Sequence, residues 1–379
     1  MLHDVIVVGS GPGGAMAASV LAARGKSVLL VDRQAFPRDK VCGDGLPMNV
    51  MVMLRDMGAD LRGLEFQRIE ALSITGPAGQ TLTTYEESQD VFSMTSRRLS
   101  FDYMLHQHAL KSGAKFEMMH VQGPLLDASG QKVIGIVERK GKTTVEHEAR
   151  MVIGADGASS PIARALQGER ITPPDATAVA IRAYGKLKHG AMPSCVYFYF
   201  HKALLPGYAW IFPIANGQAN IGVYLDNQMY RRNKRSLPEY LAEFRETLPA
   251  EFELDIDPAT VQTWPLPIWV SGETRKINGV LLVGDAGRFI NAITGGGIYT
   301  AMMTGMLAAQ HSLDVLDGTN HYPEYDSAWR PSMGSSLARA RFLQHRIAPS
   351  AFLFNTIFAI TTFPPIKASM LRALSGEHY

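Results

Sequence analysis

The sequence predicts a two-domain α/β (α+β) protein, in which a Rossmann-type domain is joined to an antiparallel-sheet domain and to C-terminal helices. A glycine-rich turn links an apolar strand to an alanine-rich helix within residues 4–32. Two later apolar strands, at residues 151–154 and 279–283, are each followed within two residues by an aspartate, which in an open α/β sheet would face the ligand crevice. Residues 176–270 alternate in polarity and are rich in aromatic side chains, which is typical of an antiparallel sheet.

The glycine-rich turn has the spacing G-x-G-x-x-G at Gly9, Gly11 and Gly14, and a second apolar strand ends on Asp32. The first glycine permits a tight turn, the second lets the backbone approach a pyrophosphate, and the third lets the helix pack closely on the strand. The N–H groups at the helix N-terminus favour phosphate, and Asp32 is in position to accept hydrogen bonds from a ribose. The alternative is a glycine turn in an ordinary βαβ unit. The predicted dinucleotide-binding residues are Gly9, Gly11, Pro12, Gly13, Gly14, Asp32 and Arg33.

Composition excludes several classes of protein. The 379 residues carry 37 basic and 35 acidic side chains, a net charge of +2, which gives no reason to expect nucleic acid as a partner. The two cysteines, Cys42 and Cys195, form no metal-type cluster, so we expect no metal site and no disulfide-built secreted fold. The N-terminus has no basic segment before the first strand, which predicts a cytoplasmic protein without a signal peptide.

The loop at residues 36–46 reads F-P-R-D-K-V-C-G-D-G-L. Its basic side chains, Arg38 and Lys40, either are solvated or balance a phosphate-bearing ligand, and Cys42 alone is most simply an inert small side chain. With the glycine motif and the acid before it, the loop resembles that of the geranylgeranyl reductase family of FAD-dependent oxidoreductases. That family has the p-hydroxybenzoate hydroxylase (glutathione reductase-2) fold. The resemblance implies bound FAD, with Cys42 and Gly43 beside the isoalloxazine ring.

Two further segments resemble cofactor elements of that family. Residues 98–102 match its R-x-x-F-D element, which implies that Arg98 contacts the cofactor and that Asp102 is structural. Without the resemblance, an arginine entering a helix is most simply solvated. Asp156 and Gly157 match the D-G element, although the aspartate and the serines after it could also serve as a turn and helix cap. We also expect a strand that ends at Val121 to line the adenosine end.

The segment at residues 284–298 resembles a third cofactor element of the family. The predicted cofactor residues here are Gly284, Asp285, Gly295, Gly296, Gly297 and Ile298. Three glycines before a long helix expose N–H groups, and the helix dipole would stabilise the anionic edge of a reduced flavin. Ala292 replaces a proline of the family and Gly296 replaces an acid, and these departures bear on the substrate and the reaction.

Residues 206–213 read P-G-Y-A-W-I-F-P, which resembles the Y-x-W-x-F-P signature of geranylgeranyl reductases more than the W-x-W-x-I-P of flavin halogenases. Tyr208, Trp210 and Phe212 alternate, so they share one face of a strand. In the family this face borders the substrate cavity, whereas the simplest interpretation is sheet core. Half of the aromatic run at residues 197–200 should face the same way. The candidate catalytic residues are Cys42, Tyr208 and Trp210.

The predicted domains are a cofactor domain at 1–70, 96–170 and 276–330, a substrate domain at 71–95 and 171–275, and a helical segment at 331–379. The prolines at 265 and 267 are expected to interrupt any strand there. Residues 347–366 carry no charge. This apolar stretch could span a bilayer, but its prolines and polar residues favour a helix that covers a lipid-binding cavity and contacts a membrane peripherally.

Three functions remain open on the sequence. The first is reduction of carbon–carbon double bonds of a polyprenyl lipid by hydride transfer from reduced FAD. The second is an FAD-dependent monooxygenase or halogenase that acts on an aromatic or polyketide-like molecule, and the third is electron relay to a quinone or partner protein. No second G-x-G-x-x-G is present. NADPH would therefore dock transiently, or another reductant such as an electron-donor protein would replace it.

Overall fold

The computed structural model describes residues 2–86, 90–167, 174–271, 276–319, 321 and 324–360. Its first sheet contains β1 (His3–Val8), β2 (Val28–Asp32), β8 (Lys115–Met118), β9 (Val121–Leu126), β10 (Val133–Lys140), β11 (Thr143–Gly154), β18 (Lys276–Ile277) and β19 (Val280–Leu282). Strands β19, β11, β1, β2 and β8 are parallel in that order, which confirms the Rossmann-type prediction. The strand predicted to run from residue 116 to 121 is instead divided between β8 and β9.

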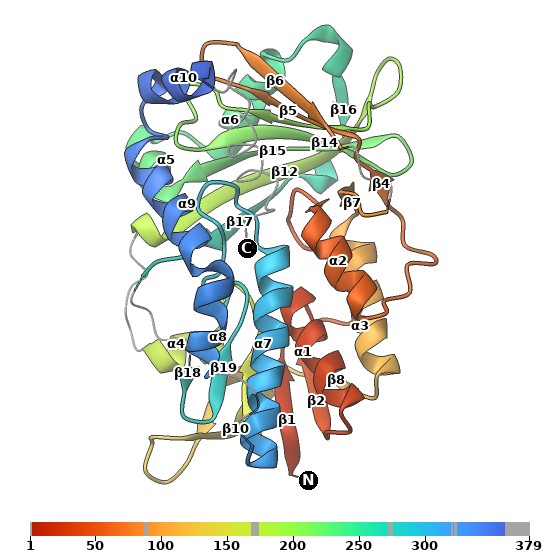
Figure 1. Ribbon diagram of the computed structural model, residues 1–379, viewed down its shortest axis with the longest axis vertical. Helices are drawn as coiled ribbons and strands as arrows, with labels where there is room; N and C mark the ends of the chain where they lie inside the picture. Colours follow the sequence, from red (N-terminus) through yellow and green to blue (C-terminus); the bar gives the residue numbers. More distant parts are fainter. Residues whose placement is uncertain are drawn as a thin grey trace.

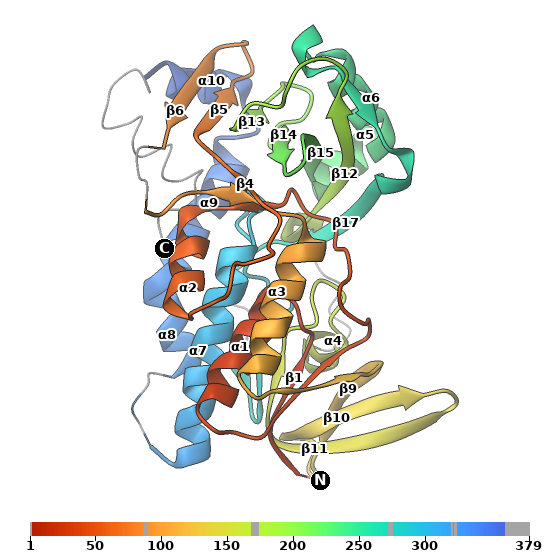
Figure 2. The same cartoon turned by 90° about the vertical axis from the view of Figure 1, so that its right-hand side faces the viewer.

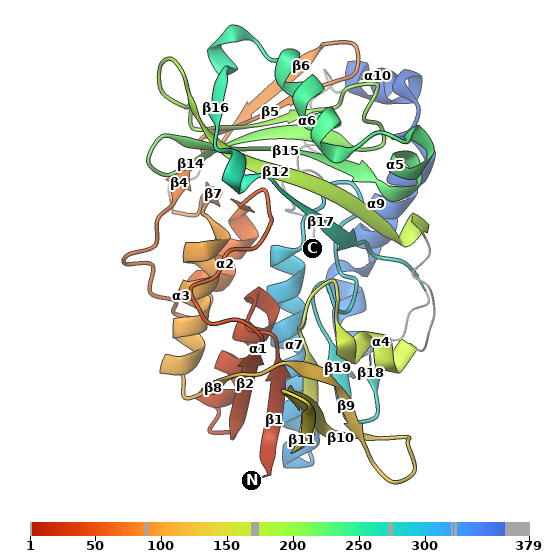
Figure 3. The same ribbon diagram turned by 180° about the vertical axis from the view of Figure 1, so that it is seen from behind.

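Several helices cover one face of this sheet. The short helix α4 (Pro161–Gln167) and the antiparallel strands β9 and β10 cover the other face. The first group is α1 (Pro12–Ala23), α2 (Met48–Asp56), α3 (Arg98–Lys111), α7 (Ile298–Asp317), α8 (Tyr325–Trp329) and α9 (Ser335–Arg346). Figures 1 and 2 show α1 between α7 and α3. On the opposite face, α4 lies against β9, as Figure 3 shows. The two faces bury separate apolar cores, so the central strands are buried on both sides.

The second sheet lies above the first in Figure 1. It contains β5 (Ala71–Thr75), β6 (Thr81–Tyr85), β12 (Thr177–Leu187), β13 (Cys195–Tyr199), β14 (Tyr208–Ile214), β15 (Gln218–Asp226), β16 (Leu254–Ile256) and β17 (Gln262–Pro267). The prediction of an antiparallel sheet is wrong for one pair, because β5 and β13 run parallel. A three-stranded sheet of β3 (Gly45–Leu46), β4 (Gln67–Arg68) and β7 (Met94–Thr95) lies between the two.

The predicted strand break at the prolines 265 and 267 is also wrong. Residues 262–267 form β17, which pairs with β12 through Val179 opposite Pro265 and Thr177 opposite Pro267. Among the described residues β17 pairs only with β12, so it is an edge strand. A proline that cannot donate a hydrogen bond is tolerated at such an edge.

The remaining helices flank the second sheet. They are α5 (Asn227–Asn233), α6 (Leu237–Glu246) and α10 (Ala351–Ile360), with short helical turns at Pro174–Ala176, Ala250–Phe252, Pro258–Thr260 and Arg330–Gly334. Helix α5 carries Arg231 and Arg232 in its last turn. Within the described part of the chain, no helix has the length and apolarity that a membrane crossing requires. The predicted apolar stretch continues past residue 360, outside the described residues.

Candidate active site

Two helices begin at one cavity, and neither has a side-chain cap at its N-terminus. Helix α1 follows Gly11 and helix α7 follows Gly297, and the glycine at each cap position has no side chain that could accept a hydrogen bond from the first turn. The first N–H groups of a helix have no partner within the helix, so these two termini remain available to a ligand with negative charge. The sequence predicted both termini as cofactor-binding elements. A bulky side chain would not fit at the turn, because a Cβ on Gly14 would lie 1.8 Å from the carbonyl oxygen of Gly9.

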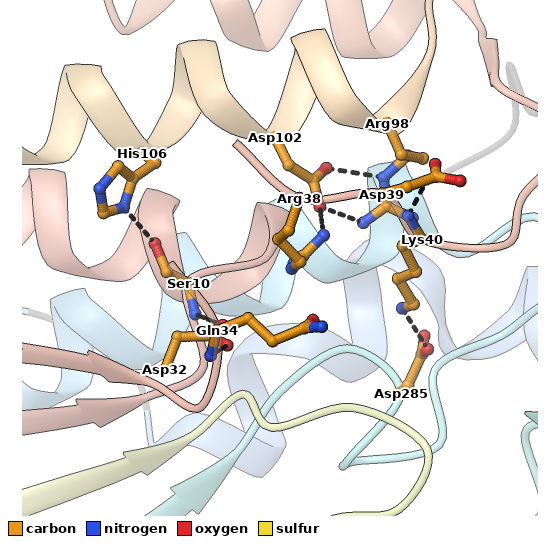
Figure 4. A network of polar contacts seen from close by, with 10 residues as sticks. All are labelled: Ser10, Asp32, Gln34, Arg38, Asp39, Lys40, Arg98, Asp102, His106 and Asp285. Carbon is orange, nitrogen blue, oxygen red and sulfur yellow. Dashed lines mark hydrogen bonds and ion pairs between the residues drawn. The ribbon is translucent and has the colours of Figure 1, made fainter. Parts of the chain in front are cut away.

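The carboxylate of Asp32 lies beside the glycine turn, at the end of β2. Its Oδ2 accepts a hydrogen bond from the Ser10 N–H at 2.9 Å, and its Oδ1 accepts one from the Gln34 N–H at 3.1 Å (Figure 4). The Met119 N–H donates to the backbone oxygen of Asp32, which brings the chain just before Val121 to this end of the site. Contact of Asp32 and Val121 with the adenosine end of a cofactor stays a prediction. The side chain of Arg33, also predicted to bind the cofactor, is exposed.

A buried carboxylate holds two arginines at the centre of the site. Asp102 accepts two hydrogen bonds from Arg98, at 2.6 and 2.7 Å, and one from Arg38 at 2.7 Å (Figure 4). Burial alone would raise the pKa of Asp102, but the two arginines outweigh it and hold that pKa below its ordinary value. Asp102 therefore is structural, as predicted. It holds Arg38 near Gly11, where a Cβ would lie 3.7 Å from the Arg38 Nη2.

A second ion pair joins the loop after β2 to the chain after β19. The Lys40 Nζ donates to the Asp285 Oδ2 at 2.9 Å, and both residues line the cavity (Figure 4). The predicted glycines at 295–297 and Ile298 line the same cavity. The fold therefore brings the predicted cofactor residues of several segments to one cavity, although the sequence did not pair Lys40 with Asp285.

The cavity has a volume of about 270 Å³ and an aromatic wall. Tyr208, Trp210 and Phe212 all line it, which confirms that they share one face of β14. Phe198 on β13 faces the same way and packs 5.1 Å, ring to ring, from Phe212. Its neighbours along β13 face the opposite side of the sheet, where Tyr197 packs against Phe252. The predicted alternation is thus correct.

The three candidate catalytic residues lie around the cavity with fixed side chains. Trp210 Nε1–H donates to the Asn220 Oδ1 at 2.8 Å, and the Tyr208 hydroxyl donates to the backbone oxygen of Thr294. Burial raises the pKa of the Tyr208 phenol and also that of the Cys42 thiol, so both groups are protonated at neutral pH. Their catalytic roles stay predictions.

Asp156 makes its side-chain contacts with helix α4. Its Oδ1 accepts from the Ser160 hydroxyl at 2.5 Å, and its Oδ2 accepts from the Ile162 N–H at 3.3 Å. Ser160 in turn caps the helix by accepting from the Ala163 N–H, as predicted. Burial raises the pKa of Asp156 to about 6. Asp156 and Gly157 follow β11 beside the glycine turn, since a Cβ on Gly9 would reach the Asp156 Cα at 3.0 Å, and their contact with a cofactor stays a prediction.

The sequence did not identify a polar cluster at the edge of the aromatic wall. Asp44 accepts hydrogen bonds from the Tyr184 hydroxyl at 2.6 Å and from the Asn220 side chain at 2.9 Å. The guanidinium of Arg182 lies 4.1 Å from the Tyr184 ring centre. Three buried polar atoms of cavity-lining residues have no hydrogen-bond partner among the described residues, namely Asp44 Oδ1, Arg182 Nε and Trp264 Nε1. The sequence contained one sign of this cluster, namely the single arginine, Arg182, within the largely apolar run at residues 177–187.

These features fit a flavin dinucleotide. Two helix N-termini capped by glycine, and one arginine, Arg38, held beside Gly11, suit a pyrophosphate. The aspartate at the end of β2 suits a ribose, and the cavity with the uncapped terminus of α7 suits an isoalloxazine ring. Fold and site together define an FAD-dependent oxidoreductase.

Comparisons with known proteins agree with this class. A family described as "FAD binding domain" matches residues 3–328. The chain is 31% identical over 343 residues to a menaquinone reductase of Mycobacterium tuberculosis, covering 89% of this chain and 82% of that protein. It is also 31% identical over 353 residues to a digeranylgeranylglycerophospholipid reductase of Methanosphaerula palustris, covering 89% and 84%.

Two solved structures extend the comparison. A geranylgeranyl bacteriochlorophyll reductase-like protein of Thermoplasma acidophilum has a TM-score of 0.84 at 25% identity, covering 100% of this chain and 96% of that one. A flavin-dependent brominase has a TM-score of 0.79 at 20% identity, covering 100% and 94%, and at that identity the likeness shows the fold alone. The chain belongs to the geranylgeranyl reductase family of FAD-dependent oxidoreductases.

Proposed function

We propose that this protein reduces carbon–carbon double bonds of a polyprenyl, geranylgeranyl-type substrate by adding two hydrogens across each double bond. The observation that carries the proposal is the shared cavity. The aromatic face of β14, with Tyr208, Trp210 and Phe212, lines the same space as the glycines at the N-terminus of α7. An apolar chain held against that face would lie beside the ring of bound FAD, which supplies a hydride when reduced.

In this proposal the protein positions the substrate and excludes water from the site. Helix α10 packs onto the second sheet through Phe354, whose ring lies 4.8 Å from that of Phe200, and through the buried Phe358. The Gln80 side chain donates to Asn355 at 2.8 Å and fixes the helix to the β5–β6 hairpin. An apolar helix over the cavity was predicted from the sequence. In this position it packs behind the aromatic wall, because Phe200 also contacts Tyr208, with ring centres 5.6 Å apart.

The alternatives have weaker support. A monooxygenase or halogenase shares the fold, but the solved halogenase resembles this chain less than the curated reductases do. Electron relay alone would need no surface for an apolar substrate, and the aromatic face of β14 that lines the cavity therefore argues against it. The electron donor in our proposal is NADPH, which docks transiently, or another reductant such as a donor protein.

A paired reaction tests the proposal. Protein purified with FAD is reduced without oxygen and given a geranylgeranyl lipid, and a second sample receives NADPH and the lipid in air. We expect mass spectrometry to show a gain of hydrogen pairs without oxygen in the first sample. An unchanged lipid together with substrate-stimulated oxygen uptake in the second sample would instead indicate a monooxygenase.

We also infer that the protein contacts membranes peripherally through its C-terminal helices. Large apolar side chains are exposed on α9 and α10, and basic side chains lie among them. The apolar residues are Phe342, Leu343, Phe352 and Leu353, and the exposed basic residues are Arg339 and Arg346. An apolar helix face with basic flanks binds anionic lipid surfaces.

Flotation with phosphatidylglycerol vesicles tests this contact. We expect the protein to float with the vesicles at low salt and less at high salt, because salt screens the basic side chains. Phe352→Asp should remove flotation, since that side chain is 78% exposed on α10. Val315→Asp, at an exposed position of α7, is the matched control and should float like the parent. Flotation that is absent at low salt, or equal in both variants, would contradict the inference.

A further inference from the structure

Asp44 is a buried carboxyl group to which the proposed reaction assigns no role so far. It lies in the loop between Cys42 and β3, it lines the cavity, and it is 0% exposed. Its backbone has φ of +66°, a left-handed conformation that aspartate adopts more readily than most residues. Its backbone oxygen accepts a hydrogen bond from the Ser96 N–H at 3.0 Å, which ties the loop to the end of β7. The fold therefore fixes this side chain in one position.

The hydrogen bonds of Asp44 distinguish its two oxygens. Oδ2 accepts from the Tyr184 hydroxyl and from the Asn220 Nδ2–H, so both of its lone pairs are engaged. Oδ1 has no partner among the described residues and is buried. Asn220 cannot turn away, because its oxygen accepts from Trp210 and its nitrogen also donates to the Cys42 backbone oxygen at 2.8 Å. A proton on this carboxyl group would therefore be carried by Oδ1.

The surroundings of Asp44 favour a carboxyl group that is partly protonated near neutral pH. Burial raises the pKa of Asp44 to about 6, while the hydrogen bonds from Tyr184 and Asn220 and the charges of Arg182 and Arg98 oppose the rise. The charge of Arg182 is itself compensated, since its Nη2 donates to the Asp39 carboxylate at 2.8 Å.

The other groups near Asp44 do not compete as acids. Burial raises the pKa of the Cys42 thiol, of the Tyr184 phenol and of the Tyr208 phenol. Each of these groups is therefore a weaker acid than Asp44. In addition, the Tyr208 hydroxyl already donates its hydrogen bond to the backbone oxygen of Thr294.

We propose that Asp44 is the acid that delivers a proton from Oδ1 to the substrate carbon that does not receive the hydride. This inference rests on the proposed double-bond reduction. One hydrogen arrives as a hydride with both electrons, from the cofactor in its reduced form. The Oδ1–H bond of Asp44 breaks and leaves its electron pair on the carboxylate, while the electrons of the former double bond form the second C–H bond. A proton from water restores the acid after the product leaves.

The first part of the test measures the carboxyl group without any reaction. In the protein freed of FAD, infrared difference spectra between pH 5 and pH 8 should show the carbonyl band of a buried carboxylic acid that titrates near pH 6. Asp44→Asn should remove that band. Tyr184→Phe should move its midpoint to higher pH, because the ionised form loses a hydrogen bond. Burial also raises the pKa of Asp156 to about 6, so Asp156→Asn removes the band of that carboxyl group and assigns the two signals.

The second part measures oxidation of the pre-reduced protein by a geranylgeranyl lipid in a single turnover. The rate of the parent should be constant below about pH 6 and fall about tenfold per pH unit above it, because only the protonated acid reacts. Asp44→Asn should keep the fold and the bound FAD but lower the rate about 100-fold or more, the usual contribution of an acid catalyst. Cys42→Ser and Tyr208→Phe compare the two other candidate donors and should retain the pH profile.

The outcomes separate this proposal from the proposed function. A parent protein that does not reduce the lipid overturns the proposed function and the proton-donor role with it. A parent that is active while Asp44→Asn is equally fast, or a carboxyl band that Asp44→Asn does not remove, overturns the role of Asp44 alone. Loss of the rate together with loss of the band supports it.

Discussion

Asp102→Ala is expected to lower the free energy of unfolding by about 3–5 kcal/mol, the usual cost of removing one partner from a buried ion pair. Arg98 is 4% exposed and loses both of its hydrogen bonds to this carboxylate, so its charge is left buried without a counterion. Arg38 is released at the same time. Because both arginines lie at the predicted cofactor site, FAD should also dissociate more readily. Urea unfolding measures the first effect, and flavin fluorescence after dilution measures the second.

Asp60→Ala is the matched control for this variant. Asp60 also forms an ion pair with an arginine, Arg62, but both side chains lie at the surface. Water replaces a lost partner there, and exposed ion pairs contribute little to stability. We expect neither unfolding nor flavin retention to change. An unfolding free energy that falls equally in the two variants would show that burial of the Asp102 cluster does not matter.

The sequence predicted the parts of the site that depend on local pattern. Gly9, Gly11 and Gly14 lie within one turn, so their spacing in the sequence already shows that they are neighbours. Tyr208, Trp210 and Phe212 lie within one strand, and the two-residue period of a strand puts them on the same face. The same holds for Asp285 and the glycines before α7, which follow a buried strand. These segments could each be compared with a family motif without knowing how the chain folds.

The Asp44 cluster could not be predicted in this way, because its members meet only through the packing of distant segments. Tyr184 is 140 residues from Asp44 in the chain, and Asn220 is 176 residues from it. Their contact depends on the register of β12 with β15, where Tyr184 is opposite Asn220. A slip of one residue by either strand would turn its side chain to the other face of the sheet and separate the two residues. Arg182 alone left a signal, as a charge inside an apolar strand.

The two errors in the second sheet have the same origin. The order of strands brings β5, from residues 71–75, beside β13 in a parallel pair, although more than 100 residues separate them in the sequence. For β17, the prolines were correct evidence against a central strand, but the sequence does not show which strands lie at an edge. In both cases the place of the strand within the folded sheet, which the local sequence does not show, determined how it pairs.

The close crossing of α1 and α7 leads to the second large expected effect, that of Gly305→Ala. Gly305 lies inside α7, and a Cβ there would be 2.1 Å from the backbone oxygen of Gly13 in α1. Gly13 is equally confined, since its own Cβ would lie 2.8 Å from the Ala301 oxygen. The two helices are therefore in backbone contact in the first turn of α1 and about two turns into α7, and the N-termini of both are predicted to bind the cofactor.

Helix propensity and packing make opposite predictions for Gly305→Ala. Propensity alone would stabilise the helix by up to about 1 kcal/mol. The clash with a backbone oxygen cannot be relieved by a side-chain rotation, so the helices must separate, at a cost of about 1–3 kcal/mol. We expect the clash to dominate. The two N-termini would then shift relative to each other, and the dissociation constant for FAD should rise about tenfold or more, which corresponds to about 1.4 kcal/mol.

Gly334→Ala separates these two effects, because Gly334 has helical angles (φ −60°, ψ −42°) and the nearest atom to its Cβ position is 3.5 Å away. This variant gains propensity without a clash, so its unfolding midpoint should stay equal or rise, with FAD affinity unchanged. Calorimetry of both variants and titration of the FAD-free proteins with FAD measure these quantities. If Gly305→Ala were as stable as Gly334→Ala and bound FAD equally well, the spacing of α1 and α7 would not set the geometry of the site. If only Gly305→Ala binds FAD more weakly, the contact between Gly305 and Gly13 sets the positions of both helix N-termini at the cofactor. That contact lies more than two helical turns from the predicted flavin edge.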